Sequence, residues 1–214
     1  VYSIEVVGAD VYAGGIFTGT VSGFDLARIG RWDGSAWHSL GSGLNVSVSA
    51  LQAVGPDLYV GGQFANAGGQ SQADWIARWD GSSWHAVGSG LNGRVSALLA
   101  VGPDLFVGGT FTNAGGKHAA DKIARWDGSE WHALDEGLNS NTSAIAVEGA
   151  KVYVAGEFTD AGGNTNGDRI ACWDRTVLSP NWQGLGAGLN GAVLAVVAVG
   201  PNVYVGGWFT DAGG

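Results

Sequence analysis

Histidines are the first candidates for acid–base or metal chemistry in this sequence, because three of its four recur at one position of a repeat. They are His38, His85 and His132, spaced 47 residues apart. Imidazoles can share one metal ion only when they converge on one point. Residues that recur once per repeat lie on separate structural units, so we interpret these histidines as structural surface residues.

A second recurring pattern could supply oxygen ligands to calcium. In three repeats an aspartate follows an Asn or Asp by eight residues, and the pairs are Asn66 with Asp74, Asn113 with Asp121, and Asp160 with Asp168. Such oxygens bind Ca²⁺ in loop sites, but they also cap turns. Because Ala27 breaks the pattern in the first repeat, we favour turn capping and predict no metal site.

The remaining chemistry-bearing residues do not assemble into a motif for catalysis. Cys172 is the single cysteine, which excludes an internal disulfide, and it replaces an arginine of the other repeats. No Ser-His-Asp spacing or phosphate-binding loop occurs. We therefore predict a protein with no catalytic residues, no metal and no cofactor.

The elements that must position these residues are set by an internal repeat. The segment IARWDGSSWH at residues 76–85 returns as IARWDGSEWH at residues 123–132. The whole unit tiles the chain as residues 1–47, 48–94, 95–141 and 142–192, followed by a half repeat at residues 193–214. Periods of this size are typical of propellers and repeat arrays.

Each unit predicts four short strands. In the second unit, apolar runs at residues 48–54, 58–64, 76–79 and 84–87 are separated by clusters of Gly, Asn, Asp, Pro and Ser, which form hairpin turns. No stretch shows helical periodicity, and runs such as Leu58-Tyr59-Val60 are typical of strands covered on both faces. We predict an all-β propeller of four-stranded blades, with about four and a half repeats of 47 residues in a single domain or propeller fragment. A β-solenoid is the alternative.

Several repeated residues resemble Kelch repeats, as in the central domain of galactose oxidase. They are a double glycine after the second strand (Gly14-Gly15, Gly61-Gly62, Gly108-Gly109, Gly206-Gly207), a Trp on the third strand (Trp32, Trp79, Trp126, Trp173) and a Trp opening the fourth (Trp37, Trp84, Trp131, Trp182). The longer sequence pattern of the repeat is similar to repeats of fungal cortical cell-polarity markers and secreted bacterial repeat proteins. The resemblance implies a propeller that binds ligands on the face carrying the loop between strands two and three. An enzyme of galactose-oxidase type is a third reading, but its copper ligands cannot be placed on this sequence.

The loop between the second and third strands varies most between repeats, and varied loops on a shared scaffold can carry specificity. Trp75 is the most informative residue of this loop, because Arg28, Lys122 and Arg169 hold the same position in the other repeats. A core position would not accept both indole and charge, so we expect Trp75 to be partly exposed and to supply apolar contact. The predicted ligand-binding residues are Phe24, Asp25, Gln70, Gln72, Trp75, His118, Lys122, Asn164, Asn166 and Arg169, with the Gln and Asn amides fixing orientation.

Charge and composition limit the partners. A formal charge of −9 disfavours nucleic acid and acidic membranes, and no apolar run is long enough for membrane insertion. Asn45 and Asn141 fit the N-glycosylation pattern, which agrees with an extracellular or cell-surface location. Because the sequence starts at Val1, has no Met and holds half of a fifth repeat, we expect a processed product or part of a longer chain, with self-association or a missing remainder.

These observations lead to one main functional hypothesis. We predict a noncatalytic binding or interaction module of a secreted or cell-surface protein, recognising a protein or glycan on its variable-loop face. The alternative is a purely structural spacer.

Overall fold

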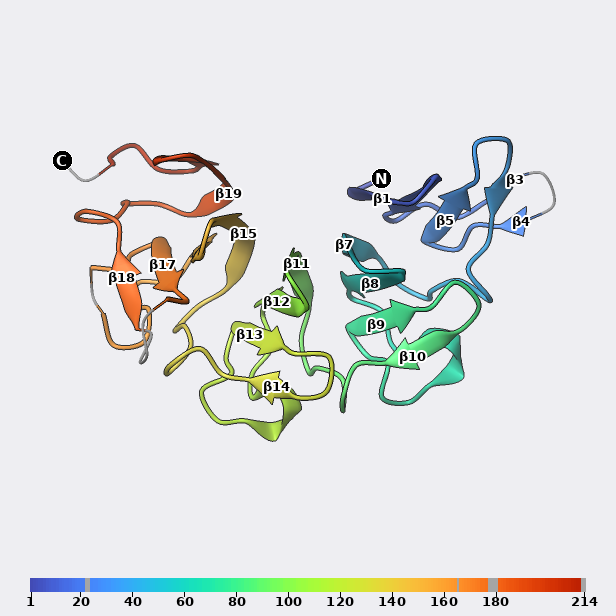
Figure 1. Cartoon of the computed structure of the whole chain (residues 1–214), viewed down its shortest axis with the longest axis horizontal. Helices are drawn as coiled ribbons and strands as arrows, with labels where there is room; N and C mark the ends of the chain where they lie inside the picture. Colours follow the sequence, from blue (N-terminus) through green and yellow to red (C-terminus); the bar gives the residue numbers. More distant parts are fainter. Residues whose placement is uncertain (22–23, 165, 177–180, 213–214) are drawn as a thin grey trace. The chain divides into compact units, whose positions relative to one another are not determined.

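The chain is built from short antiparallel sheets, shown in a computed structural model that describes residues 1–21, 24–164, 166–176 and 181–212 (Figure 1). Its described residues form strands, turns and two 3-10 turns, η1 (Ala67–Gly69) and η2 (Ala114–Gly116), with no α-helix among them. The chain divides into two compact units, Val1–Pro103 and Asp104–Gly214.

The first unit contains two complete four-stranded sheets, which we call blades 1 and 2. Blade 1 has the order β1 (Ser3–Val7), β2 (Asp10–Gly14), β5 (Ile29–Trp32) and β6 (Trp37–His38), with a small ribbon of β3 (Thr20–Val21) and β4 (Phe24–Asp25) inserted after β2. Blade 2 has the order β7 (Val48–Val54), β8 (Asp57–Gly62), β9 (Ile76–Trp79) and β10 (Trp84–Ala86). Strand β11 (Val95–Val101) follows and opens the third sheet, whose order is β11-β12-β13-β14.

The second unit continues the same meander. Its strands are β12 (Asp104–Gly109), β13 (Ile123–Trp126) and β14 (Trp131–His132), then blade 4, formed by β15 (Thr142–Glu148), β16 (Lys151–Gly156), β17 (Ile170–Asp174) and β18 (Trp182–Gly184). The last sheet has two strands only, β19 (Val193–Val199) and β20 (Asn202–Gly207). Each sheet falls inside one sequence repeat, and the predicted all-β architecture of four-stranded propeller blades is confirmed.

The turn between the third and fourth strands shows how the repeat dictates its own hairpin. In blade 2, Asp80 Oδ1 accepts hydrogen bonds from the backbone N–H groups of Ser82 and Ser83, both at 2.8 Å. Gly81 takes a φ of 98°, which residues with a side chain rarely adopt. The hairpin places Trp79 opposite Trp84 with ring centroids 5.1 Å apart, so the recurring pair of tryptophans forms one aromatic contact per blade.

Adjacent blades pack by seating one side chain on a glycine. Val48 of blade 2 lies on Gly14 of blade 1, where an added Cβ would come within 2.4 Å of Val48 Cγ1. Val95 lies on Gly61 in the same way, again at 2.4 Å. The glycine of the second strand therefore gives room for this close packing, and in the fourth repeat the buried Ala155 holds the same position.

In the second unit, Thr142 occupies the position held by those valines and seats its methyl group on Gly108. It is 1% exposed, and its hydroxyl oxygen has no hydrogen-bond partner among the described residues. The site therefore buries a polar group without compensation, which costs free energy.

The boundary of blades 1 and 2 holds a continuous apolar core. Its buried cluster includes Ile29, Leu40, Leu44, Leu58, Val60, Phe64, Ala67, Ala73, Ala77, Trp79 and Trp84. Trp84 also donates its indole N–H to the carbonyl of Leu40 at 3.0 Å. Indoles of strands three and four thus fill the space between two sheets while satisfying their polar atom.

Candidate functional site

The ten residues predicted for binding divide equally between the two units. Phe24, Asp25, Gln70, Gln72 and Trp75 belong to the first, and His118, Lys122, Asn164, Asn166 and Arg169 to the second. Phe24 and Asp25 form β4, where they pair with Val21 and Thr20, and their side chains lie outside the described residues. Each unit therefore has its own set of candidate contacts.

The last residue of the loop between strands two and three lies in the left-handed region in every full repeat. The φ angle is 69° at Arg28, 64° at Trp75, 63° at Lys122 and 64° at Arg169. Two backbone hydrogen bonds explain it in blade 2: Trp75 N–H donates to Phe64 O, and Gly62 N–H donates to Trp75 O, both at 2.9 Å. A side chain in this conformation costs on the order of 1 kcal/mol, yet no repeat uses glycine here.

The cations at this position have a structural use. Lys122 Nζ donates to the carbonyl of Thr110 at 2.9 Å, and Arg28 and Arg169 donate to the equivalent carbonyls of Ile16 and Glu157. Each bond ties the loop to a residue just after the second strand. Trp75 makes no such bond within the described part of the chain, and its side chain is partly exposed. The second repeat therefore has an indole at the position where the other full repeats have a cation that bonds a backbone carbonyl.

Gln70 and Asn164 occupy equivalent positions, and both amides are engaged by their own blades. Gln70 Nε2 donates to Trp84 O at 3.3 Å, and Asn164 Nδ2 donates to Trp182 O at 3.0 Å. The loop is thereby tied to the start of the fourth strand. Variation between repeats at this position therefore does not indicate a ligand contact, because different side chains make the same internal hydrogen bond.

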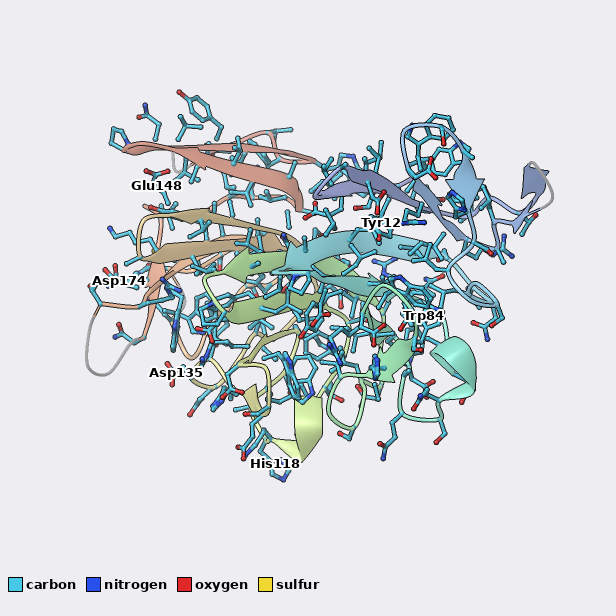
Figure 2. All side chains as sticks on the ribbon, turned by 45° about the vertical axis from the view of Figure 1, so that its right-hand side comes forward. Tyr12, Trp84, His118, Asp135, Glu148 and Asp174 are labelled. Atoms are coloured by element: carbon cyan, nitrogen blue, oxygen red, sulfur yellow. The ribbon has the colours of Figure 1, made fainter. Side chains whose placement is uncertain are left out.

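Besides Gln70, which is exposed although its amide is engaged, three of the predicted polar residues are exposed. They are Gln72 in the first unit and His118 and Asn166 in the second, and Figure 2 shows His118 at the tip of its loop. Asn166 donates its backbone N–H to Asn164 Oδ1 at 3.0 Å, which leaves its side chain available to solvent. These residues are available for contact, although the geometry assigns them no ligand.

The aspartates considered for calcium act as loop caps in two repeats. Asp74 Oδ1 accepts from Asn66 N–H and Asp121 Oδ1 accepts from Asn113 N–H, both at 2.7 Å. In the fourth repeat, Asp160 Oδ1 and Asp168 Oδ1 are buried atoms without partners in the described residues. No group of three metal-ligating side chains is found in the part of the chain that the structure describes.

The recurring histidines each face an aspartate of their own hairpin. His85 Nε2 lies 2.6 Å from Asp80 Oδ2, and the pairs of His38 with Asp33 and His132 with Asp127 have the same distance. The hydrogen bond to His85, followed by those from Ser82 and Ser83, holds the pKa of the Asp80 carboxyl well below its usual range. An anionic aspartate that organises its own turn fits a structural role.

Cys172 lies on β17 and is buried. Burial raises the pKa of its thiol, and nearby Lys151 lowers it to a smaller extent. A raised pKa keeps the group as a thiol rather than the nucleophilic thiolate, so its environment does not activate it.

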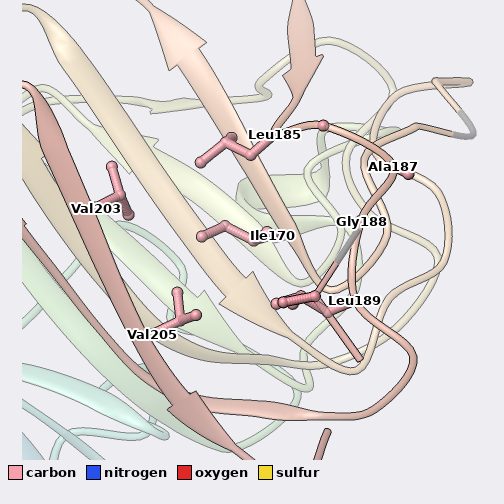
Figure 3. Close-up of a pocket in the computed structure, with 9 residues that line it drawn as sticks. Ile170, Leu185, Ala187, Gly188, Leu189, Val203 and Val205 are labelled. Atoms are coloured by element: carbon pink, nitrogen blue, oxygen red, sulfur yellow. The ribbon is translucent and has the colours of Figure 1, made fainter. Parts of the chain in front are cut away.

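A cavity that the sequence analysis did not name lies in the second unit. Its volume is about 260 Å³, and Figure 3 shows its apolar lining. The lining comes from β17, from the connection after β18, from β20 and from the segment after β20, and it comprises Ile170, Leu185, Gly186, Ala187, Gly188, Leu189, Val203, Val205 and Ala212. The sequence pattern that could have indicated this cavity is the half repeat at residues 193–214. It has the first two strands of a repeat but not the third and fourth strands that cover them in the full repeats.

No helix in the described residues is long and apolar enough to cross a membrane.

Comparisons with known proteins reveal the fold and no family. No protein-family model matches the sequence, and no curated protein matches it significantly. The computationally designed Ika8 protein superposes with a TM-score of 0.60 at 16% identity, over 95% of this chain and 54% of that one. A chain of a nidogen–laminin complex gives 0.57 at 15% identity, over 96% and 70% of the two chains, and the designed Ika4 protein gives 0.51 at 14%, over 81% and 89%. The chain thus spans about half the length of the Ika8 protein, and the likeness identifies its architecture as that of β-propeller repeats.

Proposed function

We propose that this protein is a noncatalytic binding module that recognises a protein or glycan partner through the loops between the second and third strands. The observation that carries the proposal is Trp75. Three repeats place a cation at this loop position and use it to bond a backbone carbonyl, whereas the second repeat places an indole there.

The exchange brings no evident gain to the fold. Trp75 retains the unfavourable left-handed backbone, with φ of 64°, and lacks the bond that the cations make. All four repeats share this backbone conformation, and hydrogen bonds of the loop backbone fix it in blade 2, so the side chain alone sets the second repeat apart. A partly exposed indole can stack on a sugar ring or anchor a protein interface, so recognition supplies the missing reason.

The other candidate contacts are ranked by whether their side chains are exposed and not already bonded to a backbone carbonyl. Gln72 accompanies Trp75 in the first unit, and His118 and Asn166 present polar groups in the second. Gln70, Lys122, Asn164 and Arg169 are engaged by backbone carbonyls, so we assign them to loop positioning. Phe24 and Asp25 are kept in the proposed site only because they lie in the segment between the second and third strands of the first repeat.

A protein is the partner class that we favour, with a glycan as the alternative. Support comes from the structural likeness to a chain of a nidogen–laminin complex. We also propose an extracellular or cell-surface location, supported by the two N-glycosylation patterns. Asn45 is exposed, and Asn141 is partly exposed.

The test compares the wild-type protein with Trp75→Arg, which restores the residue type of the first and fourth repeats. Both proteins are applied to a glycan array and to photo-crosslinking pull-downs from cell-surface fractions. We expect ligands that bind the wild type and lose at least about tenfold in affinity with Trp75→Arg, as for loss of an aromatic anchor.

Lys122→Arg is the matched control, because it keeps a cation at the equivalent position of the third repeat, and it should retain those ligands. Equal binding by wild type and Trp75→Arg would contradict the proposal. Failure of both proteins to bind any ligand would favour the structural spacer.

A further inference from the structure

A second cavity of the second unit has a polar lining. Its volume is about 310 Å³, and it lies between strands β12 to β14 and blade 4. It is found where β12 begins and where β13 and β17 end, at the opposite end of the strands from the loops that carry the proposed function. Six of its lining residues bear a charge or an aromatic ring: Asp104, Phe106, Arg125, His132, Trp173 and Arg175.

The wall formed by β12 to β14 is a row of side chains on one face of a sheet. Phe106 pairs with Arg125, and Arg125 pairs with His132, and side chains paired in this way project to the same face. Arg125 Nη1 donates to Asp104 Oδ1 at 2.7 Å. The other oxygen of that carboxylate makes no hydrogen bond within the described residues. The wall therefore offers guanidinium donors beside one open acceptor.

The facing wall comes from the end of β17. Trp173 and Arg175 are two residues apart and project to the same face, because the Arg175 N–H donates to Ala150 O at 3.1 Å and extends the pairing of β16 with β17. Trp182, paired with Trp173, donates its indole N–H to Leu134 O at 3.1 Å. This bond turns that face of blade 4 toward the segment after β14, so the backbone directs Arg175 to the cavity.

Arg175 is a departure from the repeat. Glycine holds its position in the other full repeats, as Gly34, Gly81 and Gly128. The other cationic side chains of the lining have carboxylate partners, Asp104 for Arg125 and Asp127 for His132. The exposed Arg175 has no side-chain hydrogen bond or ion pair with any residue that the structure describes. The fourth repeat thus adds a guanidinium that no internal carboxylate uses.

Phe106 is a second departure, on the opposite wall. The other full repeats have tyrosine at its position, as Tyr12, Tyr59 and Tyr153. In blade 1, burial raises the pKa of Tyr12, Asp10 raises it further and Arg31 lowers it, which places the phenol beside the equivalent ion pair. Phe106 has no hydroxyl, so the corner next to Arg125 has room for an oxygen atom supplied by a ligand.

We propose that this cavity binds the carboxylate of an acidic sugar, a hexuronate residue, between Arg175 and Arg125. Guanidinium groups bind carboxylates through paired, charge-assisted hydrogen bonds. The carboxylate of Asp104 in the lining disfavours a doubly charged phosphate, and its open oxygen can accept from a sugar hydroxyl. An acidic amino-acid side chain has no hydroxyl to donate there. The volume is at the lower end of ligand pockets, as suits a single sugar residue.

The probe is methyl β-D-glucuronide, titrated into the ¹⁵N-labelled full chain and followed by chemical-shift changes in NMR. We expect saturable shifts that include the indole N–H of Trp173. Methyl β-D-glucoside has the same ring without the charge and should bind at least about tenfold more weakly, because charged hydrogen bonds are lost. The methylamide of N-acetylglutamate has the carboxylate without the hydroxyls and should bind at least about fivefold more weakly.

Two substitutions restore the residues of other repeats and locate the site. Arg175→Gly should weaken glucuronide binding at least about tenfold, the scale of a lost charge-assisted hydrogen bond. Phe106→Tyr returns the hydroxyl to the corner beside Arg125 and should weaken binding at least about threefold. The matched control is Arg94→Ala, which removes an exposed arginine of the first unit and should leave binding unchanged. Trp75→Arg should also leave it unchanged, since this site is independent of the proposed function.

Four results would overturn the proposal. They are the absence of saturable shifts, equal binding of the glucoside, unchanged affinity in a folded Arg175→Gly variant, and equal or tighter binding of the glutamate derivative. The last result would make an acidic protein side chain the ligand. Circular dichroism reports folding, and Phe106→Tyr decides the location of the site if Arg175→Gly does not fold.

Discussion

The boundary between blades 1 and 2 and the boundary between blade 4 and the last sheet present the same wall residues in different states. In the first, Leu40 is 1% exposed and Val60 is 0% exposed, because indoles of the third and fourth strands cover them. In the second, Leu185 and Val205 are partly exposed around a cavity. In a complete blade, therefore, the indoles of strands three and four cover the apolar residues of strand two and of the neighbouring blade.

The largest expected effect comes from removing a sealing indole. Trp84→Ala should lower the free energy of unfolding by roughly 3–5 kcal/mol, because it empties a core site and removes the bond to Leu40. Urea unfolding followed by circular dichroism measures the change. Trp208→Ala is the control, since Trp208 is 77% exposed beside the open sheet, and it should shift stability by less than about 0.5 kcal/mol.

The glycines of the second strand give a second test of the difference between a covered sheet and the last sheet. Gly61→Ala would force a Cβ to within 2.4 Å of Val95 Cγ1, and such overpacking should cost about 1–3 kcal/mol. Gly206 holds the equivalent position on β20 and has no atom within 4 Å of an added Cβ. Gly206→Ala should therefore be neutral or stabilising by up to about 1 kcal/mol. Equal melting temperatures for the two variants would refute this account of blade packing.

A smaller, stabilising effect is expected at Thr142, which buries an unpaired hydroxyl where its sheet packs on Gly108. Thr142→Val removes a buried hydroxyl that lacks a partner among the described residues and restores the valine of the second and third repeats. Stability should rise by about 1 kcal/mol, the lower end of the cost of an unsatisfied buried group. Val95→Thr is the reverse control, and it should destabilise by a similar amount in thermal unfolding.

The fold was predictable because the repeat shows the same strands several times. The run at residues 76–79 is β9, and the run at 48–54 is β7. The run at 58–64 was predicted too long, since β8 ends at Gly62 and the buried Phe64 packs from the loop that follows. Hydrophobicity alone cannot separate a strand residue from a loop residue that points into the core.

The candidate site was only partly predictable. The exchange of Trp75 with cations identified an unusual loop position, but the left-handed backbone and the clasp of Lys122 on Thr110 depend on a contact twelve residues away. The internal roles of Gln70 and Asn164 were missed for the same reason. Variation between repeats cannot distinguish contact with a ligand from different ways of closing one loop. The Kelch resemblance stays a prediction, because the structural likenesses identify propeller blades without a family.

Whether the fold needs the Trp75 indole is measured by the free energy of unfolding of Trp75→Arg relative to the wild type in urea. Because the arginine can clasp the loop as Arg28 and Arg169 do, we predict a value within about 0.5 kcal/mol of the wild type, the range of a surface substitution. A loss of about 3 kcal/mol, the scale of removing a core aromatic, would show that Trp75 is packing and would contradict its assignment to binding.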